Sequence, residues 1–243
     1  MSLISMTLAG FKIVMDARYD FTVRQCRGYI SDFPLEEADF SVSVSEEALK
    51  REILNGGAGG EQPSPGYAES ICLYRELCLR LPQKNALLLH AAVIGDGSHA
   101  YAFTAPSGTG KSTHICRWRE AFGEPIYVIN GDKPILRLID GVWWAYGTPW
   151  CGKEGWHTNT SRPLSALCFL SRGEEDQIFR MSPLEAVPAL MHQVLLPSEP
   201  DMARSTMKLL DHLVTNVPLY RMKCTPTEAA ARVAREAMMP KES

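Results

Sequence analysis

The sequence has no long apolar run and no excess of basic residues, and each absence excludes a class of partner. A transmembrane helix needs about 18 or more consecutive apolar residues. No stretch approaches that length, so we expect no membrane partner. The 243 residues carry a formal net charge of −3 at pH 7. Because nucleic acids are bound mainly through basic surfaces, we expect no nucleic-acid partner either.

Signals for secretion and for disulfides are also missing. The N-terminus has no basic leader before an apolar segment, and none of the seven cysteines form a C-x-x-C pair. Free thiols are typical of a reducing compartment. The sequence therefore predicts a cytoplasmic protein whose cysteines are mostly small residues of the core.

Apolar residues make up 45% of the chain, enough for a large core, and one segment interrupts the pattern. Residues 55–66, NGGAGGEQPSPG, are rich in glycine, proline and serine, so we predict a flexible linker there. Strand-like runs precede this segment at 11–15, 21–25 and 40–45. The sequence thus predicts a small β-rich N-terminal portion over 1–66 and a larger domain over 67–243.

The larger part alternates strand and helix patterns. Apolar runs and tight turns predict strands at 87–94, 100–104, 126–129, 135–138, 142–146, 164–170, 177–181 and 219–222. Helical spacing and capping boxes predict helices at 67–81, 110–122, 182–195, 198–214 and 225–238. This order predicts an α/β fold with a mixed, hairpin-rich sheet. The amphipathic helices after residue 182 are expected to pack in the core or in a homo-oligomer.

The most specific motif is APSGTGKST at residues 105–113, between a predicted strand and a predicted helix. It matches the phosphate-binding loop (P-loop) pattern G-x-x-x-x-G-K-[ST], except that Ala105 replaces the first glycine. In such loops, backbone N–H groups at a helix N-terminus surround the phosphates, and the lysine contacts the β- and γ-phosphates. The candidate nucleotide-binding residues are Ser107, Gly108, Thr109, Gly110, Lys111, Ser112 and Thr113. The alternative is a glycine-rich turn with an exposed lysine.

An acidic residue is expected beside such a loop, because phosphoryl transfer needs a divalent metal ion. Asp132 follows the next strand, so its carboxylate is predicted to hold Mg²⁺ together with the hydroxyl of Ser112. The alternative is an aspartate that serves only the Asn-Gly-Asp turn, where aspartate is common. The expected cofactors are therefore ATP and Mg²⁺.

Three segments resemble the catalytic domain of HPr kinase/phosphorylase: LLLHAAVI (87–94), AYAFTAPSGTGKST (100–113) and VINGDKPIL (128–136). The wider superfamily also contains the phosphoenolpyruvate carboxykinases. The resemblance covers about residues 85–240 and is greatest to the HPr-kinase-related branch described as serine kinases. It implies a P-loop nucleotide-binding core and an ATP- and Mg²⁺-dependent phosphotransferase. The implied acceptor is a hydroxyl, such as that of serine in a protein, a peptide or a small molecule.

The resemblance also assigns roles to single residues. His90 is similar in position to the family's histidine near the phosphates, and Asp132 to the second, metal-binding aspartate of an Asp-Asp pair. The first aspartate of that pair, the general acid/base of the kinases, is Gly131 here. The matching residues of the phosphate-binding loop are Gly108, Gly110, Lys111 and Ser112.

The missing carboxylate leaves two interpretations open. Residues 147–161 form a long polar and aromatic loop whose Lys153, Glu154 and His157 are candidates for the proton transfer. The alternative is that all three are ordinary residues of a solvated loop. Alternatively, the chain is a nucleotide-sensing module that binds ATP without fast phosphoryl transfer.

Overall fold

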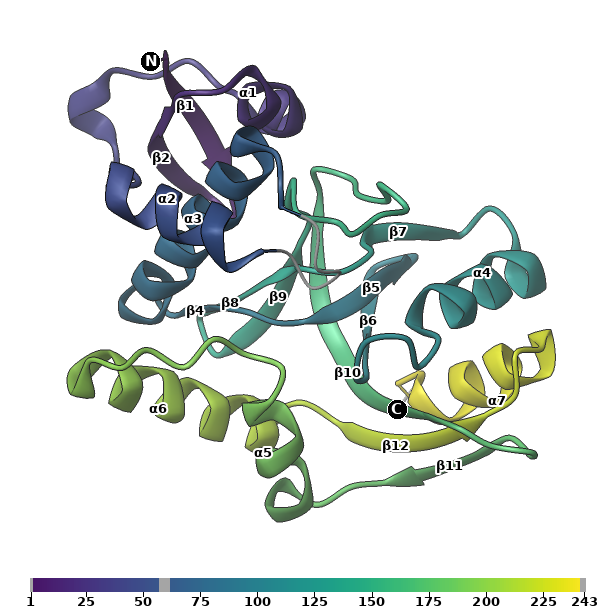
Figure 1. Cartoon of the computed structure of the whole chain (residues 1–243). Coiled ribbons are helices and arrows are strands. Elements are labelled where there is room, and N and C mark those ends of the chain that lie inside the picture. Colours follow the sequence, from purple (N-terminus) through teal and green to yellow (C-terminus); the bar gives the residue numbers. More distant parts are fainter. Residues whose placement is uncertain (1, 57–61, 241–243) are drawn as a thin grey trace. The chain divides into compact units, whose positions relative to one another are not determined.

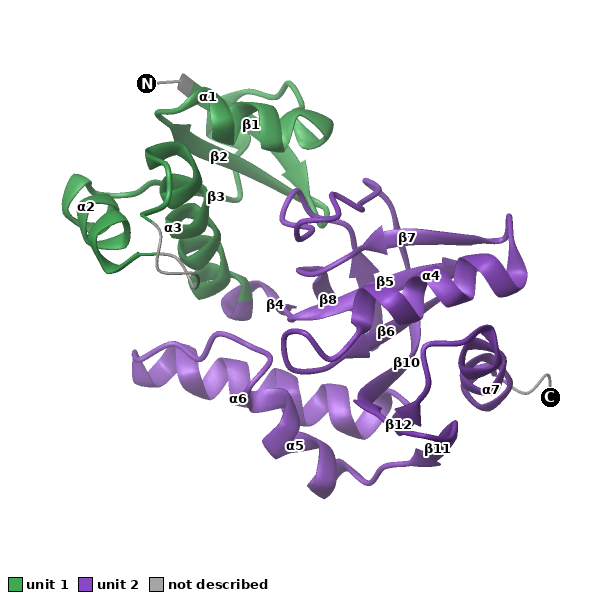
Figure 2. Ribbon diagram, turned by 45° about the vertical axis from the view of Figure 1, so that its right-hand side comes forward, with its two compact units in different colours: residues 1–81 green, residues 82–243 purple. Residues whose placement is uncertain are grey.

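The computed structural model describes residues 2–56 and 62–240, and it divides into two compact units, residues 1–81 and 82–243 (Figure 2). The boundary predicted from the sequence lies earlier, at residue 66. Helix α3 (Pro65–Arg80) accounts for the difference, because it packs against α1 (Asp20–Cys26) and α2 (Glu46–Asn55) of the first unit. Residues 57–61 of the predicted linker lie outside the described residues.

The first unit contains a small three-stranded sheet. Its elements are β1 (Ser2–Leu8), β2 (Phe11–Ala17), α1 (Asp20–Cys26), the 3₁₀ turns Arg27–Tyr29 and Leu35–Glu37, β3 (Phe40–Val42), α2 (Glu46–Asn55) and α3. Strand β2 pairs antiparallel with β1 and parallel with β3. The sheet agrees with the predicted β-rich portion, but three helices accompany it.

The predicted strand at 21–25 is wrong, because this segment belongs to helix α1. Thr22 and Cys26 are buried one helical turn apart, a spacing that a short segment does not distinguish from strand alternation. The buried carboxylate of Glu69 on α3 accepts hydrogen bonds from the backbone N–H of Arg18 at 2.8 Å and the hydroxyl of Thr22 at 2.6 Å. A contact between residues so far apart in the chain stabilises the helix.

The second unit is a nine-stranded mixed sheet in the described part of the chain, with helices on both faces (Figure 1). Its elements are the 3₁₀ turn Leu81–Lys84 at the boundary, β4 (Ala86–Leu88), β5 (Ala91–Asp96), β6 (His99–Thr104), α4 (Lys111–Phe122), β7 (Ile126–Asn130), β8 (Ile135–Ile139), β9 (Val142–Tyr146), β10 (Ser161–Arg172), β11 (Gln177–Arg180), α5 (Pro183–Met191), α6 (Pro200–Asn216), β12 (Leu219–Cys224) and α7 (Glu228–Met238). Within the described ranges, none of the helices is long and apolar enough to cross a membrane.

Central strands such as β5 are apolar on both faces because both faces are covered. Ala91 and Val93 of β5 join a core cluster with α5 and α6. The alternating residues Ala92 and Ile94 join a second cluster with α4 and α7. Sheets covered on both sides have such near-continuous apolar strands, which is why their runs were visible in the sequence.

Strands β5 and β6 form an antiparallel hairpin before residue 105, with Ala91 opposite Thr104, in agreement with the predicted hairpin-rich sheet. The single predicted strand at 87–94 is instead two strands that separate at His90. Strand β4 pairs with β8, whereas β5 pairs with β6 and β7. The break places His90 at the end of β5 rather than inside a continuous strand.

Strand order determines which loops meet. The central order is β10-β6-β5-β7, in which β5 runs antiparallel to both β6 and β7. The carboxyl ends of β6 and β7 therefore lie at the same sheet edge as the amino end of β5. Residues 105–113 follow β6, Asp132 follows β7 and His90 precedes β5, so all three lie at one edge.

Candidate functional site

Residues 105–113, called here the glycine loop, connect β6 to helix α4. Gly108 has φ 78° and Gly110 has φ 120°, left-handed values that strain any residue with a side chain. The non-glycine residues with positive φ in the described part are Ala9, Asn85 and Asp140. Ala105 is not among them and its side chain is buried in the core, which explains how the loop accepts a methyl group there.

The glycine loop ends at the free N-terminus of α4. The first amides of a helix have no partner within the helix, and here the N-cap is Gly110, which makes no side-chain cap. Residues 106–108 are exposed, whereas Ser112 on the first turn is half-buried. The uncapped amides at this helix N-terminus favour an anion.

The side chain of Lys111 turns back across this loop. Its Nζ donates to the carbonyl oxygen of Ala105 at 3.0 Å and lies 3.0 Å from Nε2 of His90. The residue is 8% exposed. Burial lowers the pKa of Lys111 below its ordinary value, and the charges of Asp132 and Glu154 oppose that shift. Lys111 is therefore not the exposed lysine of the alternative interpretation.

His90 connects Lys111 to Asp132. Its Nε2 also lies 3.1 Å from Oδ1 of Asp132. An ammonium group has only donors and a carboxylate only acceptors, so Nε2 can accept from Lys111 or donate to Asp132, but not both at once. The three side chains therefore form one hydrogen-bond system with two alternative proton positions.

Asp132 is held in place by a buried side chain. Oδ1 of Asn130, which is fully buried, accepts from the backbone N–H of Asp132 at 2.8 Å and of Lys133 at 2.6 Å. Burial acts to raise the pKa of Asp132, but the hydrogen bond from His90 and the charges of Lys133 and Lys111 outweigh it and leave the pKa below its ordinary value. Asp132 is therefore an ionised carboxylate at neutral pH.

Residues 147–161, called here the tryptophan loop, lie along β7. The N–H of Gly131 donates to the carbonyl oxygen of Trp156 at 2.8 Å, and the N–H of Thr158 donates to that of Ile129 at 3.1 Å. The hydroxyl of Thr148 donates to the carbonyl oxygen of Lys133 at 2.7 Å. The tryptophan loop is thus an ordered wall of the site.

This wall leaves no room for a side chain at position 131. A Cβ added to Gly131 would lie 2.9 Å from the carbonyl oxygen of Cys151 and 3.3 Å from that of Trp156. Contacts under 3.0 Å require something to move, and here the contacting atoms belong to backbone. The glycine at this position is therefore required by the packing of the tryptophan loop.

Of the three candidates on this loop, Glu154 is the one whose charge acts on the pKa of Lys111. Glu154 is half-buried, and its Oε2 and the Cβ of Asp132 lie 3.5 Å and 3.2 Å from the position that a Cβ of Gly152 would take. Lys153 and His157 are exposed. His157 forms a backbone bridge with Asn130, which fixes its position at the rim.

Two residues at this edge were not identified from the sequence. The guanidinium of Arg172, at the end of β10, donates to the carbonyl oxygen of Gly108 at 2.7 Å and contacts that of Thr109 at 3.4 Å. Lys133 places its Nζ 3.5 Å from Oδ2 of Asp132. Lys133 directly follows the Asn-Gly-Asp turn in the chain, whereas nothing in the sequence indicated that Arg172 approaches the glycine loop.

A scan against protein-family models and a search of curated proteins each found no match for this chain. Among solved structures, the chain is similar to the HPr(Ser) kinase/phosphatase from Coxiella burnetii, with a TM-score of 0.34 and 12% sequence identity. The match covers 62% of this chain and 97% of the other. The function proposed below therefore rests on this chain's own residues.

Proposed function

We propose that this chain is an ATP- and Mg²⁺-dependent phosphotransferase that acts on a hydroxyl acceptor, such as serine in a protein, a peptide or a small molecule. The observation that carries the proposal is the meeting of the glycine loop, Lys111, His90 and Asp132 at one sheet edge. Phosphoryl transfer depends mainly on positioning and on charge stabilisation. The site supplies uncapped amides and a buried cation, together with an ionised carboxylate.

Lys111 and the loop amides would bind the polyphosphate. The Nζ of Lys111 is already directed to the loop by Ala105 and His90, so little side-chain freedom is lost on binding. When Lys111 turns to a phosphate oxygen, Nε2 of His90 becomes free to donate to Asp132. Ligand binding would thereby fix the proton position in the hydrogen-bond system.

The donors at the site fit a Mg²⁺ ion bound together with nucleotide. Magnesium is usually held by one or two carboxylates, with substrate phosphates and water completing the shell. Asp132 would supply a carboxylate and Ser112 a hydroxyl, since in the described ranges no group of three or more His, Cys, Asp or Glu could hold a metal alone. A bound Mg²⁺ would neutralise the charge that develops on the transferred group.

Glu154 is the best placed of the three loop candidates to receive the proton of the acceptor. As the acceptor oxygen bonds to the γ-phosphorus, the bond to the β-phosphate oxygen breaks and the hydroxyl proton passes to the carboxylate. A positioned acid/base contributes roughly 10²–10⁴ in rate. Glu154→Gln should therefore lower kcat by about that factor and leave ATP binding within about twofold, whereas a change in binding alone would exclude the assignment.

The proposal is tested first by nucleotide binding. Lys111→Ala should abolish ATP–Mg²⁺ binding in isothermal titration calorimetry, because it removes the buried cation. Lys208→Ala is the matched control, since Lys208 is an exposed lysine on α6. Unchanged affinity in Lys111→Ala, or an absence of ATP binding in the native protein, would refute the proposal.

One observation favours a second candidate, a nucleotide-sensing module with lost or weak catalysis. The crowding around Gly131 excludes the carboxylate that the related kinases use at this position. The two functions are separated with γ-labelled ATP and Mg²⁺, by following label transfer to serine, to peptides and to water. Transfer to a hydroxyl supports the kinase, whereas tight ATP binding without turnover in all mixtures supports the sensor.

A further inference from the structure

Lys133 extends the hydrogen-bond system of the site on the side of Asp132. The Nζ of Lys133 lies 3.5 Å from Oδ2 of Asp132, and Nε2 of His90 lies 3.1 Å from Oδ1 of the same carboxylate. Both carboxylate oxygens therefore face a nitrogen group. Since His90 also contacts Lys111, the four side chains form a row with a lysine at each end and a single carboxylate between them.

The backbone of Lys133 is fixed, whereas its ammonium group is not. The N–H of Lys133 donates to Oδ1 of Asn130 at 2.6 Å, and its carbonyl oxygen accepts from the hydroxyl of Thr148 at 2.7 Å. Both partners are fully buried. The contact of Nζ with Asp132 is longer than a good hydrogen bond of about 2.7–3.2 Å. The side chain is 23% exposed and has a flexible four-carbon stem, so a ligand can reach its tip.

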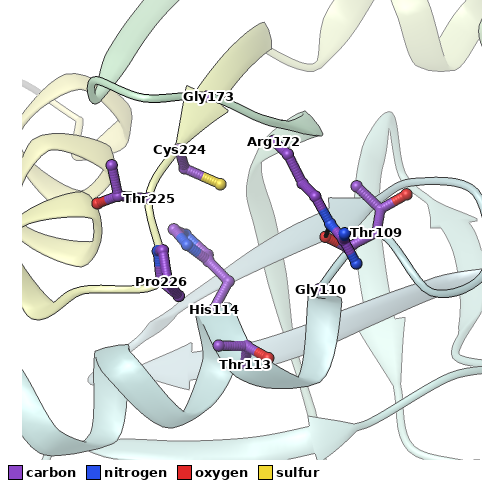
Figure 3. Close-up of a pocket in the computed structure, with 9 residues that line it drawn as sticks. All are labelled: Thr109, Gly110, Thr113, His114, Arg172, Gly173, Cys224, Thr225 and Pro226. Atoms are coloured by element: carbon purple, nitrogen blue, oxygen red, sulfur yellow. Dashed lines mark hydrogen bonds between the residues drawn. The ribbon is translucent and has the colours of Figure 1, made fainter.

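Two other cations near the glycine loop are already hydrogen-bonded to its backbone. The guanidinium of Arg172 lies against the loop at Thr109 (Figure 3), where it donates to the carbonyl oxygen of Gly108 at 2.7 Å. The Nζ of Lys111 donates to a carbonyl oxygen of the same loop at 3.0 Å. Lys133 differs from both, because moving its ammonium group breaks no hydrogen bond within the part of the chain that the structure describes.

Lys133 is also the more movable of the two neighbours of Asp132. The backbone N–H of His90 donates to the carbonyl oxygen of Gln193 at 2.7 Å, and its own carbonyl oxygen accepts from the hydroxyl of Thr104 at 2.9 Å. An ammonium group on a carboxylate oxygen competes with a divalent metal ion for that oxygen, because two cations repel each other at short range. Binding of a metal ion to Asp132 would therefore displace Lys133 rather than His90.

We propose that Lys133 is a second phosphate-binding lysine of the site, which neutralises Asp132 in the ligand-free protein and moves to the phosphate oxygens when it yields Asp132 to Mg²⁺. This inference rests on the proposed function and adds a regulation of the same site. Lys133 opposes the binding of Mg²⁺ alone and permits its binding together with a nucleotide, whose phosphates accept the released ammonium group. Each anionic group then has a cationic partner both before and after the ligand binds.

The first test measures two affinities of Lys133→Met, which keeps most of the side-chain volume but removes the charge. In calorimetry without nucleotide, Mg²⁺ should bind about threefold or more tightly, because its competitor at Asp132 is gone. Metal-free tripolyphosphate, titrated in the presence of a chelator, should bind about tenfold or more weakly, because a charge-assisted hydrogen bond is lost. A lysine that served only as the counter-ion of Asp132 would change the Mg²⁺ affinity alone.

Two further variants control this test. Lys12→Met is the matched control, because Lys12 is also a half-buried, ion-paired lysine, with Glu37 of the first unit as its partner. It removes the same charge and should change neither affinity. Lys133→Arg restores a cation, so its tripolyphosphate affinity should return to within about threefold of the native value.

The second test uses the native protein and so does not depend on the folding of a variant. Acetylation of lysines by acetic anhydride, followed by mass spectrometry, should be slowed about fivefold or more at Lys133 by metal-free tripolyphosphate, because the phosphate oxygens bind its ammonium group. Lys208, exposed on α6, is the internal control and should react at the same rate with and without the ligand.

The outcomes separate the two proposals. If the native protein binds Mg²⁺–ATP but Lys133→Met lacks either of the two opposite shifts, the inference on Lys133 is wrong and the proposed function stands. Absence of shielding at Lys133 has the same meaning, and it decides alone if the variant does not fold. If the native protein binds neither Mg²⁺–ATP nor tripolyphosphate, the proposed function fails and the inference fails with it.

Discussion

The crowding at Gly131 predicts that Gly131→Ala destabilises the second unit. The new Cβ would lie 2.9 Å from the carbonyl oxygen of Cys151 and 3.3 Å from that of Trp156. The φ of Gly131 is outside the left-handed region, so the cost is steric rather than conformational. Both contacts are backbone atoms of the tryptophan loop, which is bonded to β7 and cannot rotate away. Overpacking of this kind costs typically about 1–3 kcal/mol.

Urea denaturation followed by tryptophan fluorescence measures this effect. All five tryptophans lie after residue 82, and Trp150 and Trp156 belong to the tryptophan loop itself. The fluorescence transition therefore follows the second unit. With an m value of about 2 kcal/mol/M, a loss of roughly 2 kcal/mol lowers the urea midpoint by about 1 M.

Gly28→Ala is the matched control for this substitution. A Cβ at Gly28 has nothing within 4 Å, and its φ is also outside the left-handed region. Its fluorescence midpoint should equal that of the native protein. An unchanged midpoint in Gly131→Ala would show that the tryptophan loop moves at no cost, and the sensor hypothesis would lose its structural support.

Three further predictions concern ionisable groups that are buried or half-buried. Folding lowers the pKa of Asp132, so its ionised carboxylate stabilises the folded state above the pKa of the unfolded chain, and this contribution is lost as the pH falls through the pKa of the folded state. In urea titrations, Asp132→Asn should therefore lower the free energy of unfolding more at pH 7 than at about pH 3. Burial lowers the pKa of His114 from 6.5 to about 4, so the stability that the neutral ring provides above pH 6.5 is lost as the pH falls toward 4. Between pH 7 and pH 4, the free energy of unfolding of the native protein should fall by roughly 3 kcal/mol more than that of His114→Phe. Parallel plots of the free energy of unfolding against pH would contradict this. Glu69→Ala leaves the N–H of Arg18 and the hydroxyl of Thr22 without their acceptor, so it should destabilise the first unit by about 1–3 kcal/mol. Circular dichroism should show this loss, whereas the transition followed by tryptophan fluorescence should not shift.

Much of the glycine loop could be predicted from the sequence because its parts are neighbours in the chain. Gly108 and Gly110 lie between an apolar strand and a helix, Lys111 is the first residue of that helix, and each depends on local backbone geometry. The hairpin before the loop and the hairpin of β8 and β9 are likewise local, and both agree with the predicted hairpin-rich sheet. Local propensity and turn chemistry are sufficient for such features.

The remaining features depend on contacts between distant segments. Arg172 reaches the glycine loop only because β10 pairs parallel with β6. The break at His90 depends on two strands choosing different partners, which an unbroken apolar run conceals. The crowding at Gly131 requires the path of the tryptophan loop. Which distant segments come into contact depends on the whole fold, so local patterns in a single sequence do not predict these contacts.

The buried turn after β7 has a consequence for chemical ageing. Asn-Gly is the dipeptide most susceptible to deamidation, because the backbone nitrogen of the glycine can attack the side-chain amide carbon of the asparagine when the backbone is free to rotate. Here the N–H of Gly131 is bonded to Trp156, and the amide of Asn130 is bonded on both of its ends. Conversion of Asn130 to aspartate or isoaspartate should therefore be slow while the protein is folded. The rate of this conversion would then measure the local unfolding of the turn after β7.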